Sequence, residues 1–177
     1  MKRQYLLALA AALIAAPASY AQFAATGTTN LSVTVGPEAG LQVTTSTTTL
    51  TAAGTVFNPY SDTTNLSYKI RTTQSTGSGS VTLKVTSDFS AGGPSVTTPP
   101  SVGDALTYTC TAAAPGTPCS GSQTASVSSA TSVATFGAGA SSSNAGNAAS
   151  TIWSLTNDPV YKTGSYSATV TYTISAT

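Results

Sequence analysis

The stretch 165-SYSATVTYTIS-175 decides the fold class of this chain. Its larger apolar side chains alternate with Ser or Thr, and they stand at Tyr166, Ala168, Val170, Tyr172 and Ile174. Because successive side chains of a β-strand point to opposite faces, a period of two puts the apolar groups on one side and the hydroxyls on the other. The stretch therefore predicts a β-strand that is buried on one face only.

The same alternation recurs along the rest of the sequence. It is found at Leu31, Val33 and Val35, at Leu66, Tyr68 and Ile70, at Val81, Leu83 and Val85, and at Leu106, Tyr108 and Cys110. Trp153 and Leu155 share a face in a further strand expected near residues 151–157, and turn-forming Gly, Pro and Asn residues separate these runs. We expect an all-β protein, an antiparallel immunoglobulin-like β-sandwich of about eight short strands.

The first 21 residues are typical of a secretory signal peptide. A basic start at Lys2 and Arg3 precedes an apolar run over residues 6–16, and small residues follow Pro17. We expect residues 22–177 to form a single exported domain, with 137–150 as a flexible Gly/Ala/Ser loop. The expected location is secreted or at the extracellular cell surface, reached through the periplasm. No later apolar stretch has the length of a membrane-spanning helix.

The composition argues against catalysis. The chain has no His and only five acidic residues, whereas general acid–base catalysis draws on such groups. A Ser–His–Asp triad is impossible, and no calcium loop or phosphate-binding glycine loop is present. We expect no enzyme, no catalytic or metal site and no cofactor. Removal of residues 1–21 leaves four basic against five acidic side chains, so nucleic acid is not an expected partner.

The two cysteines, Cys110 and Cys119, are predicted to form a disulfide. An exported protein meets an oxidising environment, and the residues between them are rich in turn formers. A metal site needs more ligands than these two.

Three of the basic residues are predicted to share a sheet face. If residues 64–73 and 80–89 form a hairpin with their apolar side chains inward, Lys69, Arg71 and Lys84 all point outward. One interpretation is a basic contact surface for an acidic glycan or a neighbouring subunit. The other is that these side chains solvate the sheet and protect it against edge pairing.

A long alternation begins directly after the expected cleavage point. Its apolar positions are Phe23, Ala25, Leu31, Val33 and Val35. Such a segment can add as a donor strand to the sheet edge of the next subunit, with alternate side chains filling pockets. The alternative is an ordinary first strand paired within its own subunit.

Two stretches resemble bacterial pilin-like subunits, namely the spore-coat-protein-U-like proteins and the chaperone–usher fimbrial subunits. They are 56-VFNPY-60 followed by 66-LSYKI-70, and the ending that Gly164 opens. The chain has Ala176 where fimbrial subunits usually have a penultimate aromatic, and its cysteines lie in the second half. The resemblance implies an immunoglobulin-like sandwich and a role in a surface fibre.

We therefore expect a secreted structural subunit of a cell-surface filament, fimbria, coat or extracellular matrix, which assembles by β-strand pairing between copies. The expected partners are copies of itself or fibre subunits. The alternative is a secreted carbohydrate-binding or adhesion module that acts as a monomer on a glycan or a host or cell surface. Its candidate contact residues are Tyr60, Trp153 and Tyr161.

Overall fold

A computed structural model describes residues 26–54 and 56–177 of the chain. The expected signal peptide, Phe23 and Ala25 lie outside the described residues. The chain divides into Met1–Thr34 and Val35–Thr177. In the first unit, the described residues 26–34 belong to no helix or strand and are exposed to solvent.

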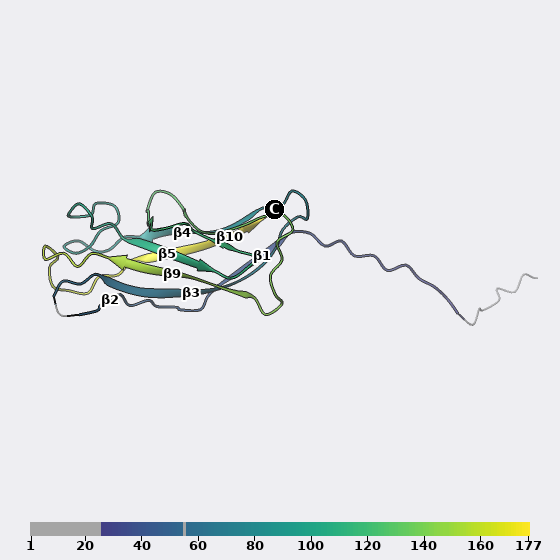
Figure 1. Ribbon diagram of the computed structural model, residues 1–177, viewed down its shortest axis with the longest axis horizontal. Helices are drawn as coiled ribbons and strands as arrows, with labels where there is room; N and C mark the ends of the chain where they lie inside the picture. Colours follow the sequence, from purple (N-terminus) through teal and green to yellow (C-terminus); the bar gives the residue numbers. More distant parts are fainter. Residues whose placement is uncertain (1–25, 55) are drawn as a thin grey trace, which may run out of the picture. The chain divides into compact units, whose positions relative to one another are not determined.

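The period-two alternation produces β-strands and, among the described residues, no helix (Figure 1). The strands are β1 (Glu38–Val43), β2 (Thr51–Ala52), β3 (Tyr60–Arg71), β4 (Gly79–Ser87), β5 (Thr107–Ala112), β6 (Thr117–Pro118), β7 (Gln123–Thr124), β8 (Thr131–Phe136), β9 (Asn147–Leu155) and β10 (Thr169–Ala176). Within the described ranges, no helix is long and apolar enough to cross a membrane.

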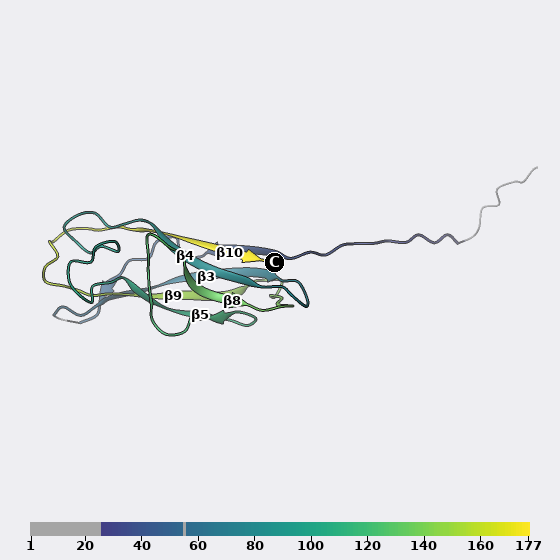
Figure 2. The same cartoon turned by 90° about the horizontal axis from the view of Figure 1, so that it is seen from above.

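The strands form two antiparallel sheets packed as a β-sandwich, which confirms the predicted all-β class. One sheet has the order β1-β3-β9-β5-β7, with β2 also paired to β3, and the other has the order β10-β4-β8-β6. Both views show β10 beside β4 and β3 beside β9 (Figures 1 and 2).

The predicted inward faces of β3 and β4 form the centre of the core. Their apolar residues are between 0% and 4% exposed, and they are Leu66, Tyr68, Ile70, Val81, Leu83 and Val85. The Thr and Ser residues between the apolar positions of β4 are more accessible. The prediction that the apolar side chains of both strands point into the core is therefore confirmed.

Two aromatic pairs pack within this core. The rings of Tyr68 and Phe136 lie 5.0 Å apart between centroids, and those of Tyr108 and Trp153 lie 5.3 Å apart, both tilted. Burial of a phenol requires a partner for its hydroxyl. The Tyr108 hydroxyl donates to the Ser132 carbonyl at 2.8 Å, so the ring is buried without an unpaired hydroxyl.

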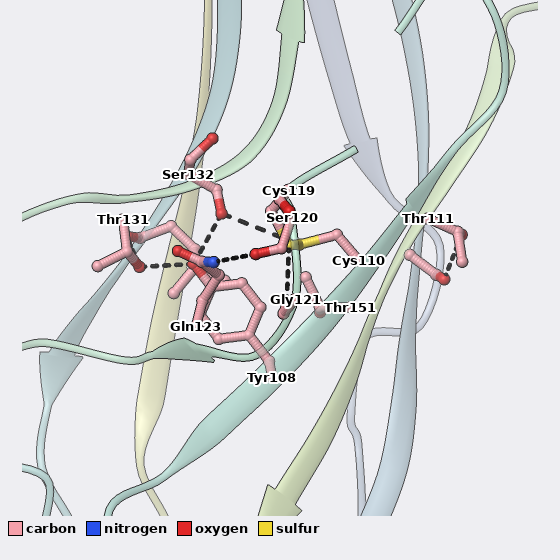
Figure 3. Close-up of a disulfide and its surroundings, with 12 residues drawn as sticks. Tyr108, Cys110, Thr111, Cys119, Ser120, Gly121, Gln123, Thr131, Ser132 and Thr151 are labelled. Carbon is pink, nitrogen blue, oxygen red and sulfur yellow. Dashed lines mark hydrogen bonds between the residues drawn. A yellow bond between two sulfur atoms is a disulfide. The ribbon is translucent and has the colours of Figure 1, made fainter. Parts of the chain in front are cut away.

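The predicted disulfide between Cys110 and Cys119 is formed, with the two Cα atoms 5.4 Å apart (Figure 3). Cys110 lies on β5 of the larger sheet. Cys119 directly follows β6 of the smaller sheet. The bond therefore links the two layers of the sandwich.

Residues 137–150 differ from the exposed loop expected there. β9 begins at Asn147, and Ala140, Ala149 and Ser150 are buried. The Thr72 amide donates to the Ala140 carbonyl at 2.9 Å. Small side chains let this backbone come close to its neighbours, so a composition typical of a loop here forms part of the packed domain.

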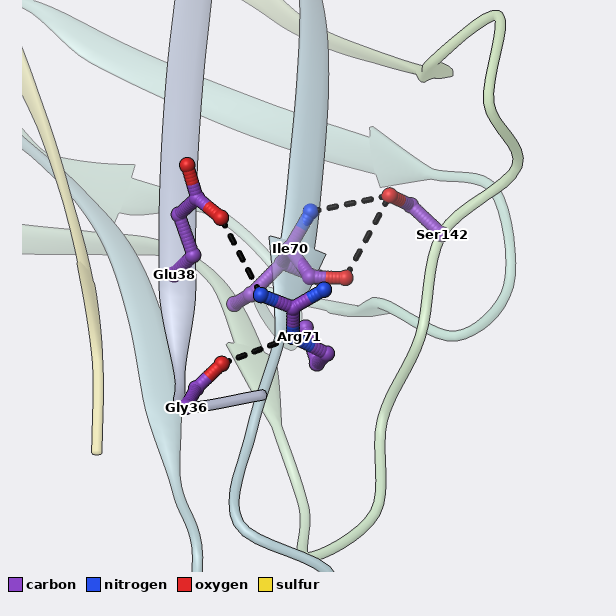
Figure 4. Close-up of polar contacts among 5 residues, drawn as sticks. All are labelled: Gly36, Glu38, Ile70, Arg71 and Ser142. Atoms are coloured by element: carbon purple, nitrogen blue, oxygen red, sulfur yellow. Dashed lines mark hydrogen bonds and ion pairs between the residues drawn. The ribbon is translucent and has the colours of Figure 1, made fainter. Parts of the chain in front are cut away.

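A hydroxyl side chain fixes the same segment to the end of β3. The Ser142 hydroxyl accepts from the Ile70 amide at 2.8 Å and donates to the Ile70 carbonyl at 3.3 Å (Figure 4). The Ser142 amide also donates to the Ile70 carbonyl at 2.9 Å. The segment thereby satisfies both main-chain groups of Ile70 where β9 no longer pairs with β3.

A candidate assembly groove

Each sheet has an incomplete edge on the same side of the sandwich. At the edge of the larger sheet, β1 pairs with the second half of β3 and ends at Val43, while β2 pairs only with Tyr60 and Ser61 at the start of β3. At the edge of the smaller sheet, β10 pairs with β4 and with no other strand of the described residues. Between β1 and β2, residues 44–50 form no strand.

A groove of about 1310 Å³ opens between these two edges. One wall is formed by residues 45–50, and the other by residues 163–170. Its apolar lining includes Leu50, Phe57, Tyr60, Phe89, Val170 and Tyr172. The groove thus lies where strand pairing is missing on both sides.

The floor of the groove is apolar, and the polar atoms of Trp153 and Tyr172 have hydrogen-bond partners. Leu106, Trp153 and Leu155 line it from below, and each is at most 5% exposed. The Trp153 indole N–H donates to the Thr64 hydroxyl at 2.9 Å. The Tyr172 and Thr151 hydroxyl oxygens lie 2.6 Å apart, and burial raises the pKa of Tyr172. The floor therefore offers apolar surface, whereas the walls at residues 45–50 and 163–170 carry mainly Thr and Ser hydroxyls.

β10 exposes part of a face that the sequence predicts to be buried. Val170, Tyr172 and Ile174 are only half-buried, whereas their partners on β4 are at most 1% exposed. Thr171 is exposed on the opposite side. The predicted facing of this strand is confirmed, and β10 lies at the edge of its sheet.

The predicted strand at Leu31, Val33 and Val35 is not formed. These residues belong to no strand, and their side chains are 94%, 85% and 61% exposed. Alternation of this kind is typical of a strand, yet these side chains have little protein contact. The described residues therefore contain both an apolar groove and a separate alternating segment without a sheet partner.

The three basic residues do not share a sheet face. Lys69 and Arg71 lie on β3 and Lys84 lies on β4, and these strands belong to different sheets. The expected hairpin fails because residues 72–78 cross from one sheet to the other.

Arg71 has partners within its own edge of the sheet. Its guanidinium lies 3.1 Å from the Glu38 carboxylate and donates to the Gly36 carbonyl at 2.7 Å (Figure 4). This pair holds the start of β1 against β3, which fits a structural use of the charge at a sheet edge.

All three candidate carbohydrate contacts, Tyr60, Trp153 and Tyr161, line the groove. Trp153 is only 4% exposed and belongs to the buried core beneath it. The sequence pattern did not predict that residues 45–50 form a wall of the groove. The only sequence feature that marks this wall is the run 44-TTSTTTL-50, which lies between two strands and has no alternation of apolar residues.

Among residues 26–54 and 56–177, no group of three or more His, Cys, Asp or Glu residues is placed to hold a metal ion. No protein-family model, curated protein or solved structure matches the chain.

Proposed function

We propose that the protein is an exported structural subunit of a cell-surface filament, fimbria, coat or extracellular matrix, and that copies assemble by β-strand pairing. In this proposal the segment at residues 31–35 of one copy enters the groove beside β10 of another copy.

The observation that carries the proposal is the groove beside an unpaired sheet edge. A sheet edge presents unpaired N–H and C=O groups, which template pairing with another chain. β10 is such an edge, and its half-buried Val170 and Tyr172 line an apolar groove. An added strand would pair with these main-chain groups and cover these side chains.

The exposed segment has the pattern that such a site requires. In an extended strand, Leu31, Val33 and Val35 would lie on one side at a spacing of about 7 Å. Main-chain hydrogen bonds then supply affinity, and alternate side chains filling the groove supply specificity. Because the groove and the segment belong to every copy, each copy can both receive and donate a strand. A contact of this head-to-tail kind forms open chains unless its rotation closes a ring.

The low charge of the chain is compatible with close packing of copies. Charged residues make up 6% of the sequence. A surface with little net charge lacks much of the repulsion that keeps soluble proteins apart.

Export and the finer fold assignment belong to the same proposal. The first 21 residues have a signal-peptide pattern, and Cys110 and Cys119 are paired, as is common in oxidising compartments. The resemblance to pilin-like subunits favours an immunoglobulin-like arrangement of the two sheets.

Charge substitutions on the two sides of the segment test the assembly. The double variant Leu31→Asp/Val33→Asp places charges where the groove is apolar, and we expect it to remain monomeric. The matched control Ser32→Asp/Thr34→Asp adds the same charge on the opposite side of the strand and should still form open chains. Sedimentation velocity and negative-stain electron microscopy distinguish the two results. Because Leu31 and Val33 are 94% and 85% exposed, neither double variant should prevent folding.

Mixed copies identify the site itself. Copies with Val33→Cys mixed with copies with Val170→Cys should form a cross-chain disulfide, whereas copies with Thr171→Cys, which points outward, should not. A wild-type chain that stays monomeric at high concentration would contradict the proposal. Glycan binding by that monomer would favour the adhesion module instead.

A further inference from the structure

An aromatic side chain stands exposed at the rim of the groove. Phe57 lines the groove, and its side chain is 57% exposed, far more than the residues of the floor. It is the only exposed aromatic residue in the described ranges 26–54 and 56–177. Its neighbour Val56 lines the same groove and is 71% exposed. Because removal of apolar surface from water is favourable, this rim gains free energy when a partner covers it.

The backbone of Phe57 has a conformation that a residue with a side chain disfavours. Its φ angle is 45°, and no other non-glycine residue in the described part of the chain has a positive φ. In this left-handed region the Cβ atom crowds the main chain, so glycine is the usual occupant. Strained residues persist where the surrounding structure imposes them, and they cluster at ligand contacts and switch regions. The conformation of Phe57 therefore points to a function of its ring.

Contacts on both sides of Phe57 hold the loop between β2 and β3. The side-chain amide of Asn58 donates to the Ala53 carbonyl, which ties the two ends of this loop together. Tyr60 then begins β3 and pairs with Leu155 of β9. The loop is thus anchored before and after Phe57, and it presents the ring at the groove without support from the core.

We propose that Phe57 determines which strand the groove accepts, and that its ring closes over the strand that one copy donates to the next. This inference rests on the proposed function, in which Leu31, Val33 and Val35 of one copy enter the groove of another. Those side chains are exposed, so a ring that covers them removes apolar surface of both copies from water. Because the backbone already holds the ring in place, binding orders little additional structure. A preorganised aromatic residue of this kind is typical of a binding hot spot.

A peptide-binding experiment tests the role of Phe57 without requiring chain formation. The acceptor is the exported chain with Leu31→Asp/Val33→Asp, expected to be monomeric, and the probe is a fluorescein-labelled peptide of residues 26–36. By fluorescence anisotropy, Phe57→Ala in this acceptor should weaken peptide binding by about tenfold or more, as loss of an aromatic hot spot does. Phe57→Tyr keeps the ring and should bind as its parent does. The matched control Val102→Ala removes an exposed apolar side chain outside the groove lining and should leave the affinity unchanged.

The stability of the Phe57 variants separates a binding role from a structural one. Phe57→Gly removes the ring and relieves the backbone strain, whereas Phe57→Ala keeps the strain. The melting temperature of Phe57→Gly should therefore exceed that of Phe57→Ala, while both variants bind the peptide equally weakly. A lower melting temperature for Phe57→Gly would overturn the strained presentation of the ring.

The same titration separates failure of this inference from failure of strand assembly. If the parent acceptor and its Phe57→Ala variant bind the peptide equally, Phe57 has no role in accepting the strand, and strand assembly stands. If the parent acceptor does not bind the peptide, both strand assembly and the role of Phe57 are contradicted.

Discussion

Cys110 and Cys119 join the two sheets at the point where β5 faces β6. The Cys119 amide also donates to the Val133 carbonyl of β8 at 2.9 Å, so the residue is held to the smaller sheet by a main-chain bond. Cys110 is fixed in the larger sheet, where it stands opposite Thr151 of β9. The covalent bond therefore connects two positions that the backbone already holds close together.

Loss of this disulfide should destabilise the protein without changing its fold. Closing a loop of this length restricts the unfolded chain by about 2–3 kcal/mol. We expect the double variant Cys110→Ser/Cys119→Ser to lose about that much free energy of unfolding in urea. Mass spectrometry before and after reduction checks the starting state, which should lack two hydrogens. An unchanged urea midpoint in the variant would contradict this expectation.

The inward face of β4 should be far more sensitive than its outward face. Leu83 is 0% exposed, and Leu83→Ala should cost about 2–5 kcal/mol, because it removes buried methyl groups and leaves a cavity. Thr82 is the adjacent residue with its side chain on the other face, and Thr82→Ala should cost less than about 1 kcal/mol. Chemical denaturation of the two variants measures the difference. Equal losses would show that the facing of β4 is wrong.

The position of β10 at a sheet edge sets the cost of a charge at Val170. Val85 is its partner on β4 and is 1% exposed, whereas Val170 is half-buried. We expect Val85→Asp to prevent folding, since it buries a charge without a partner. Val170→Asp should cost about 1–3 kcal/mol and still fold, and Thr171→Asp should be nearly neutral. Circular dichroism and thermal unfolding distinguish these three results.

Acid should destabilise the loop that follows β4. Burial acts to raise the pKa of Asp88, but hydrogen bonds from the amides of Val96, Thr97 and Phe89 outweigh it and lower the pKa to about 2. A carboxylate with a depressed pKa in the folded state stabilises the protein above its unfolded pKa near 4. That stabilisation is lost as the pH falls toward 2.

We expect a loss on the order of 1 kcal/mol from this group between pH 4 and pH 2, since solvent screens a partly exposed carboxylate. The Asp88→Asn variant should show a shallower decline of its urea midpoint over the same pH range. Asp62→Asn serves as the control and should follow the wild type. An identical pH dependence in wild type and Asp88→Asn would rule out this contribution.

The strands that local pattern could predict are those whose two faces differ in composition. In β3 and β4 the alternation of apolar and hydroxyl side chains is present in the sequence itself. The burial of Tyr68 and Leu83 follows directly from this alternation. The disulfide was predictable for a similar reason, because only two cysteines are available and turn formers separate them.

Residues 137–150 show where composition misleads. Gly, Ala and Ser are common in loops, but their small size also lets two backbones pack closely. Ala140 and Ala149 are buried because the neighbouring main chain happens to run beside them. Burial of a small residue depends on its tertiary neighbours, and its sequence pattern carries little of that information.

The sequence alone determined that the chain forms antiparallel strands, which face of β3, β4 and β10 is apolar, and which cysteines pair. Only the tertiary structure decided that β3 and β4 lie in different sheets and that β10 is an edge. It also decided that Asp104 is buried. The physical reason is that side-chain alternation is a local property of consecutive residues. Strand order, open edges and the meeting of two loops are set by contacts between residues far apart in the chain.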